Sequence, residues 1–480
     1  MKLPDHKSKI VCTIGPSSRG PNEIREMIRA GMSAARLNFS HGSPAEHAET
    51  IRIIREEAAR QNRPVPVLAD LPGPKIRVGI LSGGPIELKK GDDVVLAPSG
   101  AAGAGEIPVD YDRLHESVSR GGTIFLDDGR IRLRVLDSAA PRVFCRVVEG
   151  GLLQSRKGMN IPGSRLMPAA VTERDFQLID FALDAGLSIF CVSFVSRSDD
   201  IVRVREYARK RGGRVFVIAK IERGEAVRNM REILDAADGI MVARGDLGME
   251  IPIEDVPLVQ KELIFEANLR GKPVITATQM LESMTSSIRP TRAEVTDVAN
   301  AILDGTDAVM LSEETAVGRH PVEAVRIMSR IARKAERRRK DVPALEDIVR
   351  RGLEKRKRAA VGEAISLSIM QAIRILRVNY VLAPTHTGST PRRISRFKPD
   401  CWILSFCADE RIRLFLSLTC GVFPFPPPSG ETDAGASHEE MAVFLKNEGL
   451  AGRGDRVVLA RMTAPGVPGG LDSMGIITLV

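Results

Sequence analysis

The nine residues Arg214–Glu222, RVFVIAKIE, are typical of a strand buried on both faces that ends in a polar loop. Val215–Ala219 is a continuous apolar run, and Lys220 and Glu222 follow it. Because side chains alternate along a strand, residues two apart share a face, so this lysine and this glutamate lie side by side. Two interpretations are open here: an ion pair that closes the strand, and a metal-binding carboxylate beside a lysine that stabilises negative charge.

Seven further segments have the character of parallel strands. They are Ile10–Ile14, Met32–Ser40, Val65–Asp70, Ile189–Phe194, Gly239–Ala243, Pro273–Ala277 and Asp307–Leu311. Helical patterns separate them, and strands that alternate with helices predict a parallel sheet. With Arg214–Glu222 there are eight such strands, three before an interruption and five after it, which predicts a (β/α)8 barrel.

The interruption begins at the breaker cluster Leu71–Pro74. From about Lys75 to Pro168 the pattern is that of strands and turns, which predicts a small β-barrel inserted into the larger barrel. From about Arg351 another α/β unit begins with an amphipathic helix, Val361–Arg377. The domains expected are a barrel in two parts, residues 1–73 and 169–342, an inserted β-barrel domain, residues 74–168, and a C-terminal α/β domain, residues 343–480.

The composition is that of an ordinary globular protein with about three domains: 480 residues, 43% hydrophobic and 27% charged. Only 4% of residues are aromatic, which argues against stacking platforms for nucleic acid. Part of the net charge of +9 lies in Arg330–Lys340, which fits a solvated helix end better than a nucleic-acid site. The six scattered cysteines and the absence of a long apolar segment predict a cytoplasmic protein without a membrane or nucleic-acid partner.

Polar residues gather where the predicted strands end. They are Arg36, Asn38, Asp70, Ser193, Lys220, Glu222, Asp246, Thr278 and Ser312. Active sites of (β/α)8 barrels form at this face, which favours the functional interpretation of the lysine and glutamate over a plain ion pair. Glu222 and Asp246 suit Mg²⁺, which binds through one or two carboxylates plus substrate phosphate. Arg36 offers a planar fork for phosphate.

A hydroxyl-rich loop, Thr385–Thr390, opens a helical segment in the C-terminal unit. Such a loop can bind a phosphate-sized anion, and it can equally be a plain helix cap. The residues alone leave both interpretations open.

Six motifs resemble those of the pyruvate kinase family. They are SKIVCTIGPSS (Ser8–Ser18), ARLNFSHG (Ala35–Gly42), AKIE (Ala219–Glu222), MVARGDLGMEIP (Met241–Pro252), ATQMLESM (Ala277–Met284) and LSEETAVGRHPVEAV (Leu311–Val325). The resemblance covers essentially the whole chain. It implies the glycolytic transfer of a phosphoryl group from phosphoenolpyruvate to ADP, giving pyruvate and ATP, with Mg²⁺ or Mn²⁺, in a homotetramer.

The resemblance also implies roles for residues at matching positions. It makes Lys220, Arg36 and Thr278 catalytic, and makes Glu222 and Asp246 the ligands of the divalent metal. It assigns phosphoenolpyruvate binding to Arg36, Lys220, Gly245, Asp246, Thr278, Ser193 and Ser312. It assigns nucleotide binding to Asn38, His41, Arg77 and Lys157, the last from the inserted domain as it closes.

One departure from the family concerns the monovalent cation. The family often has DTKGPEIR where this chain has DLPGPKIR, Asp70–Arg77, so Lys75 takes the place of a glutamate. In the glutamate form, K⁺ lies in a region that matches Asn38, Ser40, Asp70 and Leu71. An ammonium group at Lys75 is expected to replace it, which predicts activity without K⁺.

The C-terminal loop resembles a sugar-phosphate effector site at Thr385, Thr387, Gly388, Ser389 and Thr390, which implies activation by a phosphorylated effector. Two alternatives remain at this stage. Another barrel enzyme that uses phosphoenolpyruvate, such as a dikinase or an aldolase, would lack the inserted β-domain. A catalytically silent effector-binding protein would not need Lys220, Glu222, Asp246 and Thr278 intact.

Overall fold

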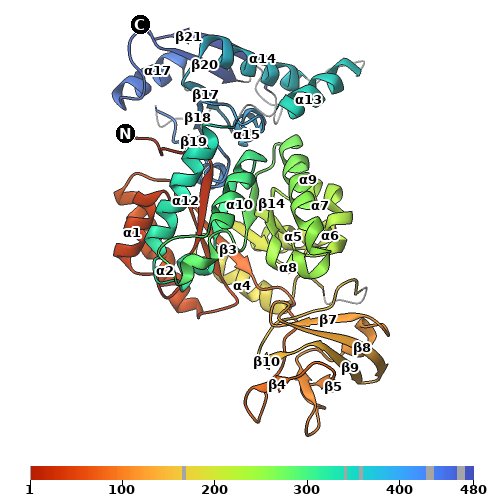
Figure 1. Ribbon diagram of the computed structural model, residues 1–480. Coiled ribbons are helices and arrows are strands. Elements are labelled where there is room, and N and C mark those ends of the chain that lie inside the picture. The colour runs from red at the N-terminus through yellow and green to blue at the C-terminus, as the bar shows by residue number, and fades with distance from the viewer. Residues whose placement is uncertain are drawn as a thin grey trace.

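The computed structural model describes residues 2–164, 169–339, 343–355, 361–428, 437–461 and 471–479. The expected domain boundaries at 168 and 342, and Lys340 at the end of the basic run, lie outside these residues. Three bodies follow one another along the molecule: the C-terminal α/β domain, the barrel in the middle, and the inserted β domain at the far end (Figure 1).

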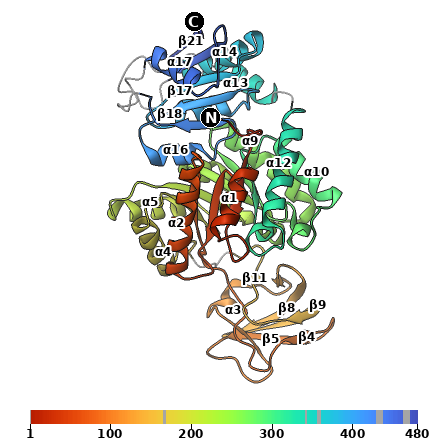
Figure 2. The same ribbon diagram turned by 90° about the vertical axis from the view of Figure 1, so that its left-hand side faces the viewer.

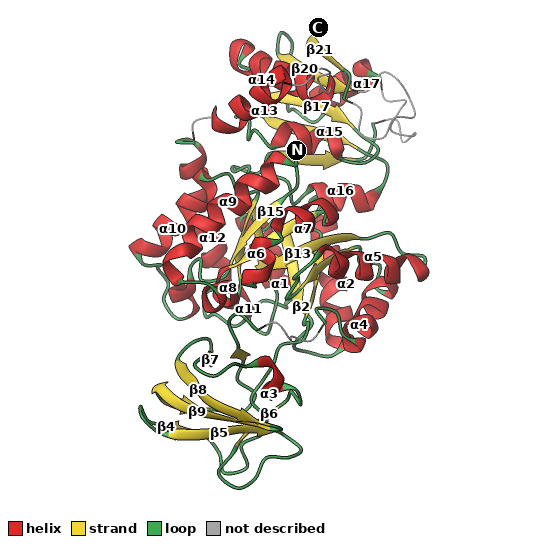
Figure 3. Cartoon of the chain, turned by 90° about the vertical axis from the view of Figure 1, so that its right-hand side faces the viewer, coloured by secondary structure: helices red, strands yellow, loops and turns green. Residues whose placement is uncertain are grey.

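Eight parallel strands close into a barrel in the order β1-β16-β15-β14-β13-β12-β3-β2, which confirms the predicted fold. The strands are β1 (Lys9–Thr13), β2 (Ala34–Asn38), β3 (Val67–Leu71), β12 (Ile189–Val192), β13 (Phe216–Ile221), β14 (Gly239–Ala243), β15 (Val274–Ala277) and β16 (Ala308–Leu311). Helices surround them (Figure 3). These are α1 (Pro21–Ala30), α2 (Pro44–Arg60), α4 (Glu173–Asp184), α5 (Ser198–Lys210), α6 (Gly224–Arg228), α7 (Met230–Ala236), α8 (Arg244–Glu250), α9 (Val256–Leu269), α10 (Arg292–Leu303), α11 (Glu313–Ala316) and α12 (Pro321–Glu336).

Strand β13 shows why the apolar run was continuous. Val217 and Ala219 pack in the core between the barrel and its helices, whereas Ile218 packs inside the barrel. Both faces are therefore buried, and the alternation continues into Lys220 and Glu222. These two residues share the face of Ile218, which directs both of them towards the barrel axis.

The inserted domain is almost entirely β-structure. Its strands are β4 (Ile86–Leu88), β5 (Asp93–Pro98), β6 (Ile107–Val109), β7 (Thr123–Leu126), β8 (Ile131–Ala139), β9 (Arg142–Glu149), β10 (Gly151–Leu153) and β11 (Met159–Asn160). Six of them form one sheet whose outer strands are β6 and β11. Val78 pairs with Val109, and Arg77 pairs with Gly158, so residues 77–78 bridge the two outer edges of this sheet. The short helix α3 (Leu114–Ser117) was not expected.

The C-terminal domain has a five-stranded sheet in the order β19-β18-β17-β20-β21. Its strands are β17 (Tyr380–Pro384), β18 (Trp402–Phe406), β19 (Val422–Phe425), β20 (Arg456–Arg461) and the antiparallel β21 (Ser473–Thr478). Its helices are α13 (Pro343–Lys355), α14 (Val361–Leu376), α15 (Ser389–Ser395), α16 (Glu410–Leu416) and α17 (His438–Asn447). This sheet and its helices confirm the predicted C-terminal α/β unit.

A buried ion pair fixes the C-terminal domain to the barrel. Lys398 Nζ lies 2.7 Å from Asp307 Oδ1, and the two side chains are 1% and 2% exposed. Asp307 immediately precedes β16, so this contact lies at the amino ends of the barrel strands. The carboxyl ends therefore face the inserted domain (Figure 2). Among the described residues, no helix combines the length and the apolar character needed to cross a membrane.

Candidate active site

Lys220 is the centre of a buried charge cluster at the carboxyl ends of the strands. Its ammonium donates to Ser193 Oγ at 2.7 Å and lies 2.9 Å from Glu222 Oε1 and 3.3 Å from Asp70 Oδ1. Burial lowers the pKa of Lys220, but the carboxylates of Asp70 and Glu222 outweigh it, so the pKa lies above its ordinary value. The ammonium group therefore stays charged at neutral pH.

Arg36 joins this cluster from β2. Its Nε donates to Asp70 Oδ2 at 2.5 Å, Nη2 also contacts this oxygen, and Nη1 donates to Thr13 Oγ1 at 2.9 Å. The Arg36 side chain is 12% exposed and that of Asp70 2%. Two cations from different strands thus flank one buried aspartate, an arrangement that attracts a further anion.

Glu222 and Asp246 are the two carboxylates of the predicted metal site. Burial raises the pKa of Glu222, the ammonium of Lys220 lowers it, and the charge of Asp246 raises it again. The two acids therefore repel one another, and a divalent cation would relieve this repulsion. No group of three or more His, Cys, Asp or Glu side chains suited to a metal occurs among the described residues. Two carboxylates fit Mg²⁺, which takes its other ligands from water and substrate.

Thr278 lies just after β15 in an unusual turn. Its φ is 69°, and its Oγ1 accepts a hydrogen bond from Gly245 N at 2.9 Å and donates one to Ala277 O at 2.6 Å. The amide of Gly245, a residue expected to bind phosphoenolpyruvate, is therefore paired with Thr278 in this structure. Ser312 lies on the neighbouring strand end, where its amide donates to Glu314 Oε2 at 2.6 Å.

The four predicted nucleotide-binding residues come from two domains. Asn38 ends β2, where its Oδ1 accepts from Ser40 N at 3.1 Å, and His41 follows as an exposed side chain. Arg77 and Lys157 belong to the inserted domain beside its junction with the barrel. Arg77 Nη1 donates to Arg156 O at 3.0 Å, and Lys157 Nζ lies 2.8 Å from Asp127 Oδ1. A nucleotide that used all four would lie between the domains.

Comparison with protein-family models gives two matches. "Pyruvate kinase, barrel domain" matches residues 5–325, and "Pyruvate kinase, alpha/beta domain" matches residues 363–477.

This chain belongs to the pyruvate kinase family.

Relatives in this family cover almost all of the chain. A pyruvate kinase of Thermococcus litoralis is 48% identical over 478 residues, which are 99% of this chain and 99% of that protein. One from Geobacillus stearothermophilus is 42% identical over 98% of this chain and 80% of its own length. The crystal structure of a pyruvate kinase from Cryptosporidium parvum has a TM-score of 0.91 at 37% identity and covers 99% of this chain and 97% of that one. The enzyme is a kinase of this family.

Lys75, the predicted substitute for K⁺, contacts acids of both the barrel and the inserted domain. Its ammonium is 3.1 Å from Asp246 Oδ1 and 4.0 Å from Asp128 Oδ1, whereas Asp70 pairs with Arg36 and Lys220. Leu71 contributes its carbonyl to Ser193 Oγ at 2.8 Å. The lysine therefore links the barrel rim to the inserted domain beside the predicted metal site.

The predicted effector loop is partly engaged with itself. Thr385 Oγ1 accepts from Gly388 N at 2.9 Å, and Thr387 Oγ1 donates to Ser389 Oγ at 3.1 Å. Thr385 and Thr390 are each 6% exposed, whereas Thr387 is exposed. These contacts close the loop on itself, whereas the helix that follows, α15, has Gly388 at its N-cap and no side-chain cap hydrogen bond. The outer rim of the loop is open to solvent.

Three site residues escaped the sequence analysis: Thr13, Arg244 and Glu314. Thr13 Oγ1 accepts a hydrogen bond from Arg36. The Glu314 carboxylate accepts hydrogen bonds from the amides of Ser312 and Leu281, at 2.6 and 3.0 Å. Thr13 is the last residue of β1 and Arg244 directly follows β14, so the rule that polar strand ends build the site would have found them. Glu314 has no comparable signal because its role depends on a loop from a different strand.

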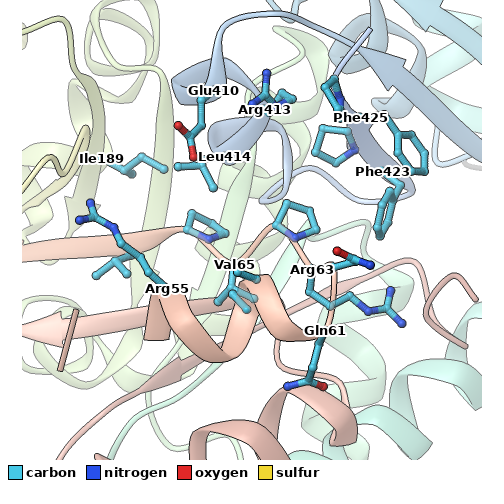
Figure 4. A pocket seen from close by; sticks show the side chains of 18 of the residues that line it. Arg55, Gln61, Arg63, Val65, Ile189, Glu410, Arg413, Leu414, Phe423 and Phe425 are labelled. Carbon is cyan, nitrogen blue, oxygen red and sulfur yellow. The ribbon is translucent and has the colours of Figure 1, made fainter. Parts of the chain in front are cut away.

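A cavity of about 1040 Å³ lies away from this site, between the barrel and the C-terminal domain. Arg55, Arg63 and Val65 line it from the barrel side, and Glu410 and Arg413 from the other (Figure 4). None of the predicted site residues lines it. Cavity size alone therefore does not locate the chemistry in this fold.

Two arginines of the basic run, both in α12, are paired with acids. Arg330 Nη2 lies 3.3 Å from Glu323 Oε1, and Arg333 Nη1 lies 3.7 Å from Asp5 Oδ2. This pairing at a helix end favours the interpretation of a solvated surface.

Proposed function

We propose that this enzyme transfers the phosphoryl group of phosphoenolpyruvate to ADP, yielding pyruvate and ATP, in the cytoplasm. The observation that carries the proposal is the cluster of Arg36, Lys220 and Glu222 with Asp70 at the carboxyl end of the barrel. Phosphoryl transfer needs alignment and neutralisation of charge more than covalent catalysis, and this cluster offers fixed cations for both.

In the proposed mechanism Arg36 and Lys220 bind the transferring phosphoryl group. Asp70 contacts both cations, so it holds their charged groups in place before substrate arrives. Once the phosphoryl group leaves, the enolate oxygen of pyruvate carries negative charge. The raised pKa of Lys220 keeps its ammonium protonated, so it stabilises this oxygen.

Glu222 and Asp246 would hold a divalent cation, Mg²⁺ or Mn²⁺, with substrate oxygens completing its ligands. When bound, the cation neutralises charge on the phosphoryl oxygens. Glu222 Oε2 accepts from Phe194 N at 2.7 Å, which fixes the orientation of the carboxylate. Lys75 lies on Asp246 and supplies a positive charge near the phosphates, which supports activity without K⁺.

Thr278 is proposed to bind substrate and to support the delivery of a proton, through water, to the enolate carbon. Ser193, Gly245 and Ser312 complete the phosphoenolpyruvate site. Asn38, His41, Arg77 and Lys157 are proposed to bind ADP as the inserted domain closes over the barrel. Closure would exclude water, which otherwise competes with ADP for the phosphoryl group.

The C-terminal loop Thr385–Thr390 is proposed to bind a phosphorylated sugar or nucleotide that activates a homotetramer. Trp402 is a suitable reporter because it pairs with Tyr380 on β17, the strand that leads into this loop. Fructose 1,6-bisphosphate, ribose 5-phosphate and AMP are the probes. An effector that changes neither Trp402 fluorescence nor the kinetics has no regulatory role at this loop.

The test of the function is an assay coupled to lactate dehydrogenase, with phosphoenolpyruvate, ADP and Mg²⁺, in the presence and absence of K⁺. We expect ADP-dependent formation of pyruvate that requires the divalent cation and rises less than about tenfold when K⁺ is added. Pyruvate formation independent of ADP would indicate a different reaction. A rise above about tenfold with K⁺ would refute only the role of Lys75.

A further inference from the structure

The turn that carries Thr278 has an unfavourable backbone. Thr278 and Gln279 have φ values of 69° and 54°, so two consecutive residues with side chains occupy the left-handed region. Steric contact of Cβ disfavours this region for residues other than glycine. Neighbouring groups must therefore hold the turn in place.

Arg244 is the group that holds it. Its Nη2 donates to Thr278 O at 2.7 Å, and its Nε donates to Ala277 O at 3.2 Å. The same Nη2 lies 2.8 Å from Met280 Sδ. One planar guanidinium thus binds the carbonyl groups on both sides of the Thr278 Cα, which fixes the direction of the threonine side chain.

The opposite edge of the guanidinium is anchored to two outer helices. Nη1 donates to Asp297 Oδ1 on α10 at 2.7 Å and to Gln260 Oε1 on α9 at 3.2 Å. The Arg244 side chain is 12% exposed. Both helices are parts of the barrel wall. The guanidinium therefore connects the Thr278 turn to a rigid part of the fold.

The backbone of Arg244 leads directly into the predicted metal site. Gly245, the next residue, donates its amide to Thr278 Oγ1 at 2.9 Å, and Asp246 follows. We propose that Arg244 is a positioning residue that fixes the Thr278 hydroxyl relative to the Asp246 carboxylate. The side chain of Arg244 holds the turn that carries Thr278, and its main chain leads to Asp246. This inference rests on the proposed role of Thr278 in phosphoryl transfer from phosphoenolpyruvate.

The experiment compares Arg244→Lys and Arg244→Ala with the unmodified enzyme in the coupled assay. We expect Arg244→Lys to lower kcat about tenfold with KM for ADP nearly unchanged, because one ammonium cannot span both carbonyls in a plane. Arg244→Ala should lose about a hundredfold and recover about tenfold when ~20 mM guanidinium chloride fills the gap, whereas methylammonium should not restore it. The pyruvate methyl group should exchange its protons with D₂O more slowly in both variants.

Two control variants separate positioning from general damage. Arg270 also pairs with a carboxylate, Asp235 at 2.8 Å, and with the carbonyl of Glu266 at 3.2 Å, but it lies at the amino end of the barrel. Arg270→Lys should keep kcat and methyl exchange unchanged. Thr278→Ala tests the underlying role by itself.

Each outcome decides a different claim. Normal kcat in Arg244→Lys beside a slow Thr278→Ala overturns the positioning inference and leaves the proposed function intact. A slow Arg244→Ala that guanidinium does not restore, with a lowered melting temperature, also overturns it because the loss is then structural. Normal kcat in Thr278→Ala removes the role of Thr278 and the inference with it. Recovery of Arg244→Ala activity with guanidinium, but not with methylammonium, supports the inference.

Discussion

The buried pair between Lys398 and Asp307 makes a quantitative prediction about how the domains are joined. Lys398→Met leaves the Asp307 carboxylate buried without its cation, and loss of one partner from a buried pair costs about 3–5 kcal/mol. Asp307 keeps two backbone donors, Cys420 N at 2.9 Å and Val274 N at 3.1 Å, which compensate part of the loss. We therefore expect the lower end, about 3 kcal/mol.

The measurement is urea unfolding followed by the fluorescence of Trp402, the one tryptophan of the chain, which lies in the C-terminal domain. Lys7→Met is the matched control because Lys7 also bridges the two domains, 2.9 Å from Asp400 Oδ1, whose side chain is 93% exposed. An exposed pair contributes about 0–1 kcal/mol. The double variant Lys398→Met/Asp307→Asn should regain part of the lost stability. If Lys398→Met lost no more stability than Lys7→Met, the buried pair would not be what joins the domains.

Three further predictions concern charge. Burial lowers the pKa of Lys9 to about 8. The folded state therefore binds fewer protons than the unfolded state between about pH 8 and pH 10.5, so the free energy of unfolding should rise with pH in this window. Denaturant titrations of Lys9→Met at these two pH values should not show this rise. In the coupled assay, K⁺ should raise the turnover of Lys75→Glu more than about tenfold. If this variant were equally active with and without K⁺, the proposed cation substitution would be refuted. Glu222→Gln should raise the Mg²⁺ concentration for half-maximal activity at least about tenfold in a metal titration, and an unchanged titration would remove Glu222 from the metal site.

The barrel could be predicted from sequence because its signals are local. Val215–Ala219 is apolar on both faces of one strand. The other barrel strands are likewise apolar segments followed by polar residues. The C-terminal strand β19 gave no such signal because Pro424 lies within it. A proline cannot donate to a ladder, and β19 tolerates it at the edge of the sheet.

The site was predictable in its members and not in their contacts. The pattern of polar residues at strand ends predicted Lys220 and Glu222, because the residues that follow parallel strands meet at one face of a barrel. The position of Lys75 depends on the path of a loop with Gly73 at φ 62°, and the contacts of Arg244 depend on where α9 and α10 pack. Both are results of tertiary packing, which the spacing of residues along one segment does not encode.

The turnover of Lys220→Met tests the central claim most directly. Lys220 Nζ is the cation that Ser193, Glu222 and Asp70 surround, so its loss should leave the enolate oxygen without its partner. In the lactate-dehydrogenase-coupled assay at saturating phosphoenolpyruvate, ADP and Mg²⁺, we expect kcat to fall at least a hundredfold, about 2.7 kcal/mol, while circular dichroism shows the fold retained. Near-normal kcat in the folded variant would contradict the account.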